Sequence, residues 1–142
     1  MNKAKPKSGL DDIPRTMPAM LEAAKLGSRA SKVGFDWPDA EGLFAKLQEE
    51  FAELQAEVSN PEVSQDRIEE ELGDLLFTAV NLARHLKVDT ESALRSANAK
   101  FRKRFRTMET AAGGFDALAQ RTPAELDALW NDAKQAESQP SH

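Results

Sequence analysis

The sequence predicts an all-α protein, and three observations favour this class. Apolar residues recur every three or four positions through four long stretches, which gives each stretch one core-facing side as a helix. Helix-stopping residues separate the stretches, at Gly34, at Asn60–Pro61 and at Gly113–Gly114. No stretch alternates apolar and polar residues as a half-buried strand does, and no internal repeat is present. We therefore expect a helical bundle of four main helices plus a short C-terminal helix.

Composition places the chain among soluble globular proteins. Its 142 residues are 40% hydrophobic and 30% charged with a net charge of -5, which suits one domain with its own core. The lack of cysteine excludes disulfides, thiol catalysis and thiolate metal sites, and two histidines are too few for a His-rich metal site. The first residues lack the apolar segment of a signal peptide, and the longest apolar run, residues 75–83, is too short to span a bilayer. We expect a cytoplasmic protein without a membrane partner.

The boundaries follow from periodicity. Residues 1–15 carry lysine and proline without a repeat and are predicted to be a flexible arm, residues 16–136 form the domain, and residues 137–142 form a disordered tail. The first helix should begin at Pro18, a residue suited to the first helical position, and run to about Lys32.

The second helix should run from Pro38 to about Val58. Before it, Phe35 and Trp37 lie in a compact connector, where we expect them to pack and cap the core. The helix has an apolar stripe composed of Leu43, Leu47, Phe51, Leu54 and Val58.

The central helix, residues 67–86, is the segment around which the chain is organised, with Ser64 or Asp66 as its cap. From Leu72 onward it is apolar on nearly every side, so we expect it to be buried and to need a second chain to cover it. One stripe is nevertheless polar, and its members are Arg67, Glu71, Asp74, Thr78 and Asn81. Carboxylates on a buried helix are costly unless a cation compensates them.

Two further helices complete the expected fold. The fourth starts at Asp89 or Thr90 and has an apolar stripe of Leu94, Ala97, Phe101, Phe105 and Met108. The last opens with a capping box, Thr122 to Glu125, has proline at its first helical position, and should fray from about Gln135.

The short turn between the second and third helices predicts an antiparallel hairpin. If residue 62 is the centre of that turn, Glu50 lies opposite Asp74 and Glu53 lies opposite Glu71. Four carboxylates converging without compensation would repel one another, and a hard divalent cation such as Mg²⁺ or Mn²⁺ resolves this.

These acidic residues admit two other interpretations, a solvated helix face and a di-iron carboxylate bundle. Taken alone, Glu50 and Glu53 are typical of a solvated helix face, whereas Asp74 directly precedes an apolar run. A di-iron carboxylate bundle needs Glu-x-x-His motifs, and the residue three positions after Glu71 is an aspartate.

The fourth helix supplies five cations within seven residues: Lys100, Arg102, Lys103, Arg104 and Arg106. Lys100 and Arg104 are one turn apart beside the apolar stripe, whereas Arg102 and Arg106 point elsewhere. A net charge of -5 and 6% aromatic residues argue against an extended nucleic-acid surface. Carboxylates that hold a metal, with a Lys/Arg pair nearby, suit a polyphosphate substrate.

These motifs resemble a known family. The segments are Ile13-Pro14-Arg15-Thr-Met-Pro18-Ala, Gly34-Phe-Asp-Trp-Pro, Lys46-Leu-Gln-Glu49-Glu50-Phe-Ala-Glu53, Glu70-Glu71-Leu-Gly-Asp74-Leu-Leu-Phe, Asn81-Leu-Ala-Arg84 and Asn98-Ala-Lys100-Phe-Arg-Lys-Arg104-Phe. Together they resemble the MazG family of nucleoside triphosphate pyrophosphohydrolases, specifically its C-terminal catalytic domain, over about residues 10–134. The resemblance implies a homodimer and Mg²⁺-dependent hydrolysis of nucleoside triphosphates to the monophosphate and pyrophosphate, a reaction that cleans the nucleotide pool.

The resemblance also implies roles for individual residues. The implied metal ligands, which with Glu49 form the catalytic set, are Glu50, Glu53, Glu71 and Asp74. The residues implied around the nucleotide are Lys46, Glu49, Arg67, Glu70, Asn81, Asn98, Lys100 and Arg104. Trp130 and Lys134 would contact the base. Arg67 departs from the lysine of relatives, which keeps the charge but not its geometry.

We therefore expect a Mg²⁺-dependent hydrolase in which Glu49 or Glu53 orients or deprotonates the attacking water. Lys100 and Arg104 would stabilise charge on the leaving pyrophosphate. Two alternatives remain: a non-catalytic helical dimerisation module and a nucleic-acid-binding helical protein.

Overall fold

The computed structural model describes residues 7–138, and within them it contains helices but no strands, which confirms the all-α class. The helices are α1 (Ala19–Ser31), α2 (Ala40–Ser59), α3 (Gln65–His85), α4 (Thr90–Ala112), α5 (Phe115–Leu118) and α6 (Pro123–Ser138). The chain forms two compact units that meet at residues 92 and 93, with α1 to α3 in the first and nearly all of α4, with α5 and α6, in the second. No helix within the described range is long and apolar enough to cross a membrane.

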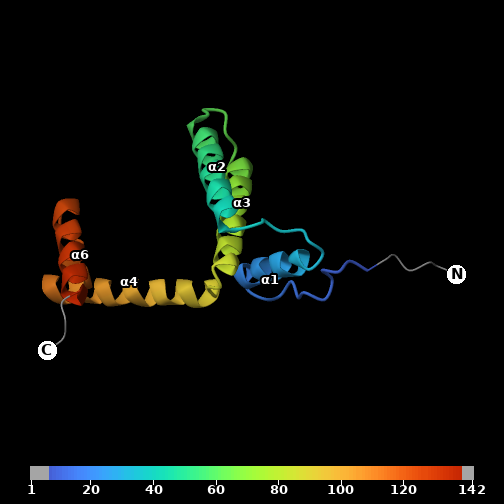
Figure 1. Ribbon diagram of the computed structural model, residues 1–142. Coiled ribbons are helices and arrows are strands. Elements are labelled where there is room, and N and C mark those ends of the chain that lie inside the picture. Colours follow the sequence, from blue (N-terminus) through green and yellow to red (C-terminus); the bar gives the residue numbers. More distant parts are fainter. Residues whose placement is uncertain (1–6, 139–142) are drawn as a thin grey trace. The chain divides into compact units, whose positions relative to one another are not determined.

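In the first unit, α2 and α3 form the expected antiparallel hairpin, and α1 packs against α3 (Figure 1). The pairing register of the hairpin is confirmed by an ion pair next to its turn. Arg67 Nη2 lies 2.7 Å from Glu57 Oε1, and these two residue numbers average 62. The same register places Glu53 opposite Glu71.

Local capping interactions set the ends of the central helices. Ser64 Oγ accepts a hydrogen bond from the Arg67 N–H at 3.3 Å, which identifies Ser64 as the cap of α3. At the other end, Lys87 has a φ of 61° and the Val88 N–H donates to the Ala83 carbonyl at 2.9 Å, a Schellman-type stop. The start of α2 was expected at Pro38, but Asp39 is the cap, since its Oδ1 accepts from the Gly42 N–H at 2.9 Å.

The crossing of α1 and α3 is tight because of one glycine. A Cβ on Gly27 would overlap the Oδ1 of Asn81 and lie 2.9 Å from its Cγ. Asn81 is fully buried at 0% exposure, and its Nδ2 donates to the Phe77 carbonyl at 2.9 Å. The absence of a side chain at Gly27 therefore lets α1 approach the polar stripe of α3.

Contacts to α1 also hold part of the predicted N-terminal arm. Arg29 Nη1 donates to Asp12 Oδ1 at 2.7 Å, and Ile13 is buried at 7% exposure. Arg29 Nη1 also donates to the Gly9 carbonyl, so the chain is anchored on α1 from about Gly9 onward.

The expectation that α3 is buried from Leu72 onward is wrong for this chain by itself. Leu72 is 42% exposed, Leu76 51% and Phe77 39%, whereas the polar Thr78 is buried at 3%. Within the first unit α3 packs against α1 and α2, so its remaining apolar side has no further layer to cover it. Phe35, expected to cap the core, is 80% exposed in the connector between α1 and α2.

The second unit differs from expectation in two ways: the one-turn helix α5 was not expected, and the last helix, α6, is longer than predicted. Gly114, with a φ of 130°, ends the run of α4 and leads into α5, which is too short to produce an apolar periodicity. The capping box is confirmed, with the Thr122 N–H donating to Glu125 Oε1 at 3.0 Å and the Glu125 N–H donating to Thr122 Oγ1 at 3.2 Å. Helix α6 continues to Ser138, past the expected fraying point at Gln135.

Candidate functional site

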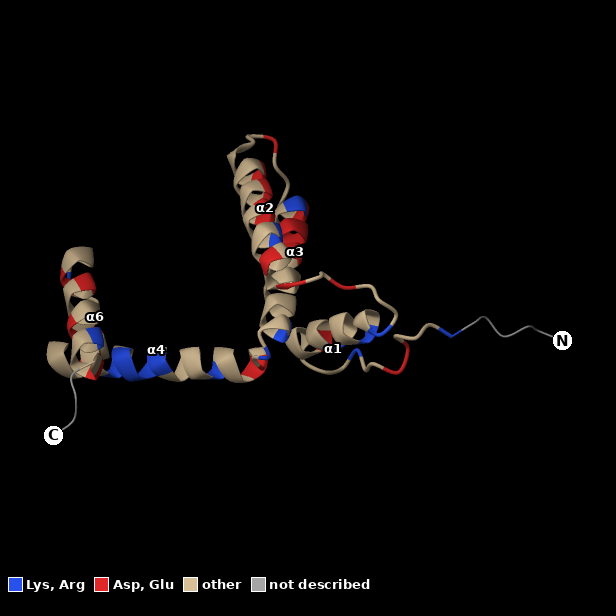
Figure 2. Ribbon diagram, viewed as in Figure 1, with Lys and Arg blue, Asp and Glu red and all other residues tan. Residues whose placement is uncertain are grey.

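The α2–α3 hairpin brings three of the expected carboxylates together. Glu50 and Glu53 lie one turn apart on α2 and Glu71 faces them from α3, and one carboxylate oxygen from each lies within 4.8 Å of the others. Figure 2 shows acidic residues on both helices of this hairpin. We call Glu50, Glu53 and Glu71 the carboxylate group.

The burial of Glu50 corrects the interpretation that α2 merely presents a solvated acidic face. Glu50 is 4% exposed, and its Oε1 lies 3.2 Å from Lys46 Nζ. Its Oε2 and the Oε2 of Glu71 are buried and have no hydrogen-bond partner among the described residues. A buried charged oxygen without a partner is costly, so these two atoms are suited to a ligand that supplies positive charge.

The electrostatics of Glu71 point the same way. Burial raises the pKa of its carboxyl above the usual value, and the charges of Glu53 and Glu50 raise it further. Across the group, the hydrogen bond to Glu50 and the charge of Glu49 raise the pKa of Lys46. Because Lys46 carries a single positive charge, it offsets only part of the negative charge of the three carboxylates.

The donor set fits a hard divalent cation. Three carboxylates offer oxygen ligands alone, the type that Mg²⁺ and Mn²⁺ prefer, and two of their oxygens are buried without a partner. Asp74 lies outside the group and is exposed, so the expected approach of Asp74 to Glu50 is not part of this arrangement. Its charge still raises the pKa of Glu71.

The other expected residues of the first unit have different surroundings. Lys46 borders the carboxylate group, and its Nζ lies 3.7 Å from Glu49 Oε2. Arg67 is engaged by Glu57, and Glu70 is exposed.

Asn81 is fully buried with both ends of its amide engaged, since its Oδ1 accepts from Arg84 Nε at 3.1 Å. Asn81 therefore serves packing between α1 and α3 in this structure and is closed to a solute.

The second unit holds the expected cationic and aromatic residues, and Figure 2 shows the basic run along α4. The guanidinium carbon of Arg104 lies 5.4 Å from the centroid of the Trp130 ring. Lys100, Asn98 and Lys134 are exposed. The structure thus brings Arg104 and Trp130 together, two residues that the sequence placed on different helices.

Sequence reasoning missed Glu137. Its Oε2 accepts a hydrogen bond from Arg104 Nε at 3.0 Å. The predicted tail began at this residue, and no local motif marks a partner 33 positions away in the sequence. The sequence does show that Glu137 lies seven positions, about two helical turns, after Trp130, which places the two residues on the same side of a helix.

A second missed cluster ties the α1–α2 connector to the end of α3. The carboxylate of Asp36 accepts from Arg84 Nη2 at 2.6 Å and from Arg84 Nη1 at 3.1 Å, and Nε2 of His85 lies 2.9 Å from Asp36 Oδ1. The Arg84 contacts hold the pKa of Asp36 well below its usual value, with added contributions from His85 and the Trp37 N–H. We call Asp36, Arg84 and His85 the connector network.

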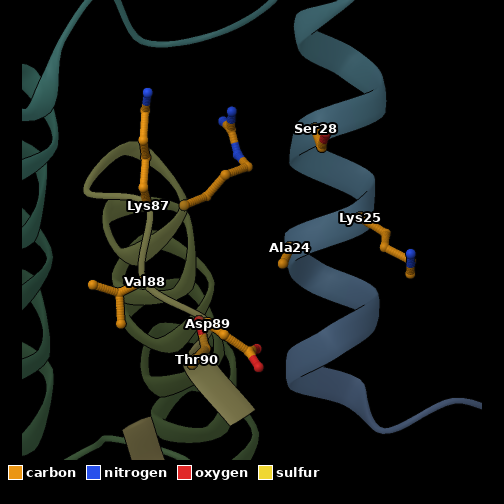
Figure 3. A pocket seen from close by; sticks show the side chains of 8 residues that line it. Ala24, Lys25, Ser28, Lys87, Val88, Asp89 and Thr90 are labelled. Carbon is orange, nitrogen blue, oxygen red and sulfur yellow. The ribbon is translucent and has the colours of Figure 1, made fainter. Parts of the chain in front are cut away.

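A cavity of about 330 Å³ lies between α1 and the turn that follows α3 (Figure 3). Lys25, Arg84 and Lys87 are among its lining residues. In Figure 3 the Lys25 and Lys87 side chains extend in different directions, and Arg84 is committed to Asp36. The cavity therefore lacks a converging set of donors.

The fold and the carboxylate group define an all-α protein with a candidate site for a divalent cation. The sequence model of the MazG nucleotide pyrophosphohydrolase domain matches residues 39–108, the span that contains the whole group. The chain therefore contains a domain of the MazG family at residues 39–108.

Two curated relatives extend the similarity over most of the chain. A nucleoside triphosphate pyrophosphohydrolase from Escherichia coli strain K12 is 42% identical over 132 residues, which cover 92% of this chain and 50% of the relative. A protein from Thermotoga maritima named nucleoside triphosphate pyrophosphohydrolase/pyrophosphatase MazG is 44% identical over 134 residues, which cover 93% of this chain and 51% of the relative. The chain thus spans about half the length of the curated relatives it matches.

Proposed function

We propose that this protein is a Mg²⁺-dependent nucleoside triphosphate pyrophosphohydrolase, which hydrolyses ribo- or deoxyribonucleoside triphosphates to the monophosphate and pyrophosphate. The observation that carries the proposal is a pair of buried carboxylate oxygens, on Glu50 and Glu71 of the carboxylate group, that have no hydrogen-bond partner within residues 7–138. The names of the two relatives support the reaction, since both are pyrophosphohydrolases of nucleoside triphosphates.

The carboxylate group would hold the cation through Glu50, Glu53 and Glu71. Asp74, whose charge raises the pKa of Glu71, would be a fourth ligand. When bound, Mg²⁺ or Mn²⁺ supplies positive charge that offsets the carboxylates and the phosphate oxygens. Glu49 or Glu53 would orient the attacking water and take its proton as the new P–O bond forms. The P–O bond to the pyrophosphate then breaks, and pyrophosphate leaves.

The second unit would serve the same substrate through its cations and its aromatic side chains. Lys100 and Arg104 would stabilise negative charge on the leaving pyrophosphate. Trp130 and Lys134, which lie one helical turn apart on α6, would contact the base.

We also propose that two copies associate as a homodimer. The exposed apolar side of α3 at Leu72, Leu76 and Phe77, together with Phe44 and Phe51 on α2, supports an obligate type of interface. Sedimentation that showed a well-folded monomer at micromolar concentration would contradict the dimer.

The main alternative is a nucleic-acid-binding protein, and the basic run of α4 separates the two. For the hydrolase, Lys100→Ala and Arg104→Ala should each cost about 2 to 4 kcal/mol of transition-state stabilisation, while Arg102→Ala and Arg106→Ala cost little. A nucleic-acid surface would show the reverse pattern, in which replacing each outward cation weakens binding and lowers its salt dependence.

The direct experiment is a panel of nucleoside triphosphates with Mg²⁺, in which pyrophosphate and monophosphate are both measured. The proposal expects the two products in equal amounts. Release of orthophosphate, or no product from any nucleotide, would contradict it, and the second result would favour a non-catalytic dimerisation module.

A further inference from the structure

Arg104 is held from two sides by residues of α6. Glu137 Oε2 accepts a hydrogen bond from Arg104 Nε at 3.0 Å, and the guanidinium carbon lies 5.4 Å from the centre of the Trp130 ring. The side chains of Arg104 and Glu137 are 16% and 22% exposed. Phe101 extends the aromatic surface, with its ring 5.4 Å from that of Trp130.

Among the described residues, no hydrogen bond engages the two terminal nitrogens of Arg104. A guanidinium has five N–H donors, and Glu137 engages the one on Nε. The two terminal nitrogens are the pair that binds a phosphate in a bidentate manner. An arginine whose rotamer is already fixed loses less entropy when it binds its substrate.

Stability alone does not account for the position of Glu137. Its second oxygen, Oε1, is buried without a hydrogen-bond partner among the described residues. A charged oxygen left in this state costs free energy, so the ion pair is a poor way to stabilise the packing of α6 on α4. The benefit lies instead in where the pair holds Arg104.

We propose that Glu137 is a positioning residue: it fixes the Arg104 guanidinium over Trp130 so that the two terminal nitrogens face the phosphates of a nucleoside triphosphate. This inference rests on the proposed pyrophosphohydrolase function and adds to it a residue beyond the motifs of the sequence. Glu137 itself would not touch the substrate.

The test compares Glu137→Ala with Glu137→Gln in steady-state kinetics with Mg²⁺ and the best nucleotide of the panel. Glu137→Ala removes the acceptor and should lower kcat/KM about tenfold, whereas Glu137→Gln keeps an acceptor oxygen for Arg104 Nε and should stay within about threefold of wild type. Asp132→Asn, at an exposed position of the same helix, is the matched control and should leave kcat/KM unchanged.

A double-mutant cycle separates positioning from a structural role. In the Arg104→Ala protein, Glu137→Ala should cause no further loss of kcat/KM, because there is no guanidinium left to position. A structural role predicts instead that Glu137→Ala lowers activity in both backgrounds, in step with a loss of folded protein. That outcome, or an active wild type with kcat/KM equal to that of Glu137→Ala, would overturn this inference alone. A wild type that hydrolyses no nucleotide would overturn the proposed function and, with it, the role of Glu137.

Discussion

The first unit contains two partly buried clusters of charged residues that are built in opposite ways. In the connector network, the carboxylate of Asp36 is matched by both terminal nitrogens of Arg84 and by His85, and its pKa lies well below the usual value. In the carboxylate group, Glu50 has one lysine contact and Glu71 has a raised pKa. Each of these two residues also has a buried oxygen without a hydrogen-bond partner in the described part of the chain.

This difference separates charges that hold the fold from charges that await a ligand. A carboxylate with all its partners in the chain stabilises the structure and has little capacity left for chemistry. A carboxylate with a raised pKa and a free buried oxygen weakens the fold until a cation arrives, a pattern typical of functional sites. Mutations in the connector network should therefore change stability, and mutations in the carboxylate group should change activity.

The largest expected effect lies at the proposed metal ligands, both in the carboxylate group and at Asp74, the proposed fourth ligand outside it. Glu71→Gln and Asp74→Asn should each lower kcat/KM by about 100-fold or more, equivalent to ~2.7 kcal/mol of transition-state stabilisation, because each removes a negative ligand of the cation. Pyrophosphate release measures this, with Glu69→Gln on an exposed position of α3 as the matched control. A variant that kept more than about a tenth of the wild-type rate would refute the assignment of that ligand.

The next effect should appear at the crossing of α1 and α3, as a loss of stability without a specific loss of chemistry. Gly27→Ala forces a Cβ into Asn81, a fully buried residue, and should lower the free energy of unfolding by about 2 kcal/mol. Ser28→Ala, at the neighbouring exposed position of α1, should be neutral or slightly stabilising. Urea unfolding of the two variants checks this, and equal stability would show that the crossing is loose.

The two clusters should also respond to pH with opposite signs. Because the pKa of Asp36 is lowered on folding, its stabilisation is present above the unfolded value near 3.8 and is lost as the pH falls below it. Asp36→Asn should therefore cost about 2 kcal/mol at neutral pH and progressively less in acid.

Glu71 should behave in the reverse manner in metal-free protein. Its pKa is raised on folding, so its favourable contribution is complete below the unfolded value of 4.5 and is lost as the pH rises through the folded pKa. Glu71→Gln should raise the stability of the metal-free protein at neutral pH, and the gain should vanish towards pH 4.5. Chemical denaturation as a function of pH compares the two variants, and parallel curves would contradict the distinction between the clusters.

The smallest effect is expected at the exposed ion pair that marks the hairpin register. Arg67 is 60% exposed at its side chain, so Arg67→Ala should change the free energy of unfolding by less than about 1 kcal/mol, and by less still at high salt. Thermal unfolding at two salt concentrations measures this. A loss well above that value would show that the Arg67–Glu57 pair stabilises the fold as strongly as the connector network does.

The sequence predicted what local chemistry determines. The cap at Ser64, the end of the central helix near residue 86 and the capping box at Thr122 are set by residues within a few positions of each other, and the structure confirms each. The hairpin register also followed, because a short turn fixes which residues of two helices lie opposite. The meeting of Glu53 with Glu71 was predictable for that reason.

Contacts over long sequence distances were not predictable in this way. Asp36 and Arg84 are 48 positions apart, and neither belongs to a periodic pattern that points to the other. The burial of Glu50 depends on how closely α2 and α3 approach, which periodicity does not specify. Glu137 was missed because the end of the last helix was predicted from its falling apolar content. The pairing of Glu137 with Arg104 forms only when the second unit is folded.

The most direct test of the account is a calorimetric titration of Mg²⁺, and separately of Mn²⁺, into wild-type and Glu71→Gln protein without nucleotide. The account predicts that wild type binds the cation and that the variant loses most of this binding, because Glu50, Glu53 and Glu71 supply the ligands. In a parallel thermal unfolding experiment, a cation concentration of about 100 times the Kd should stabilise wild type by ~2.7 kcal/mol and leave the variant nearly unchanged. Equal cation affinity in the two proteins would contradict the claim that the carboxylate group is the metal site.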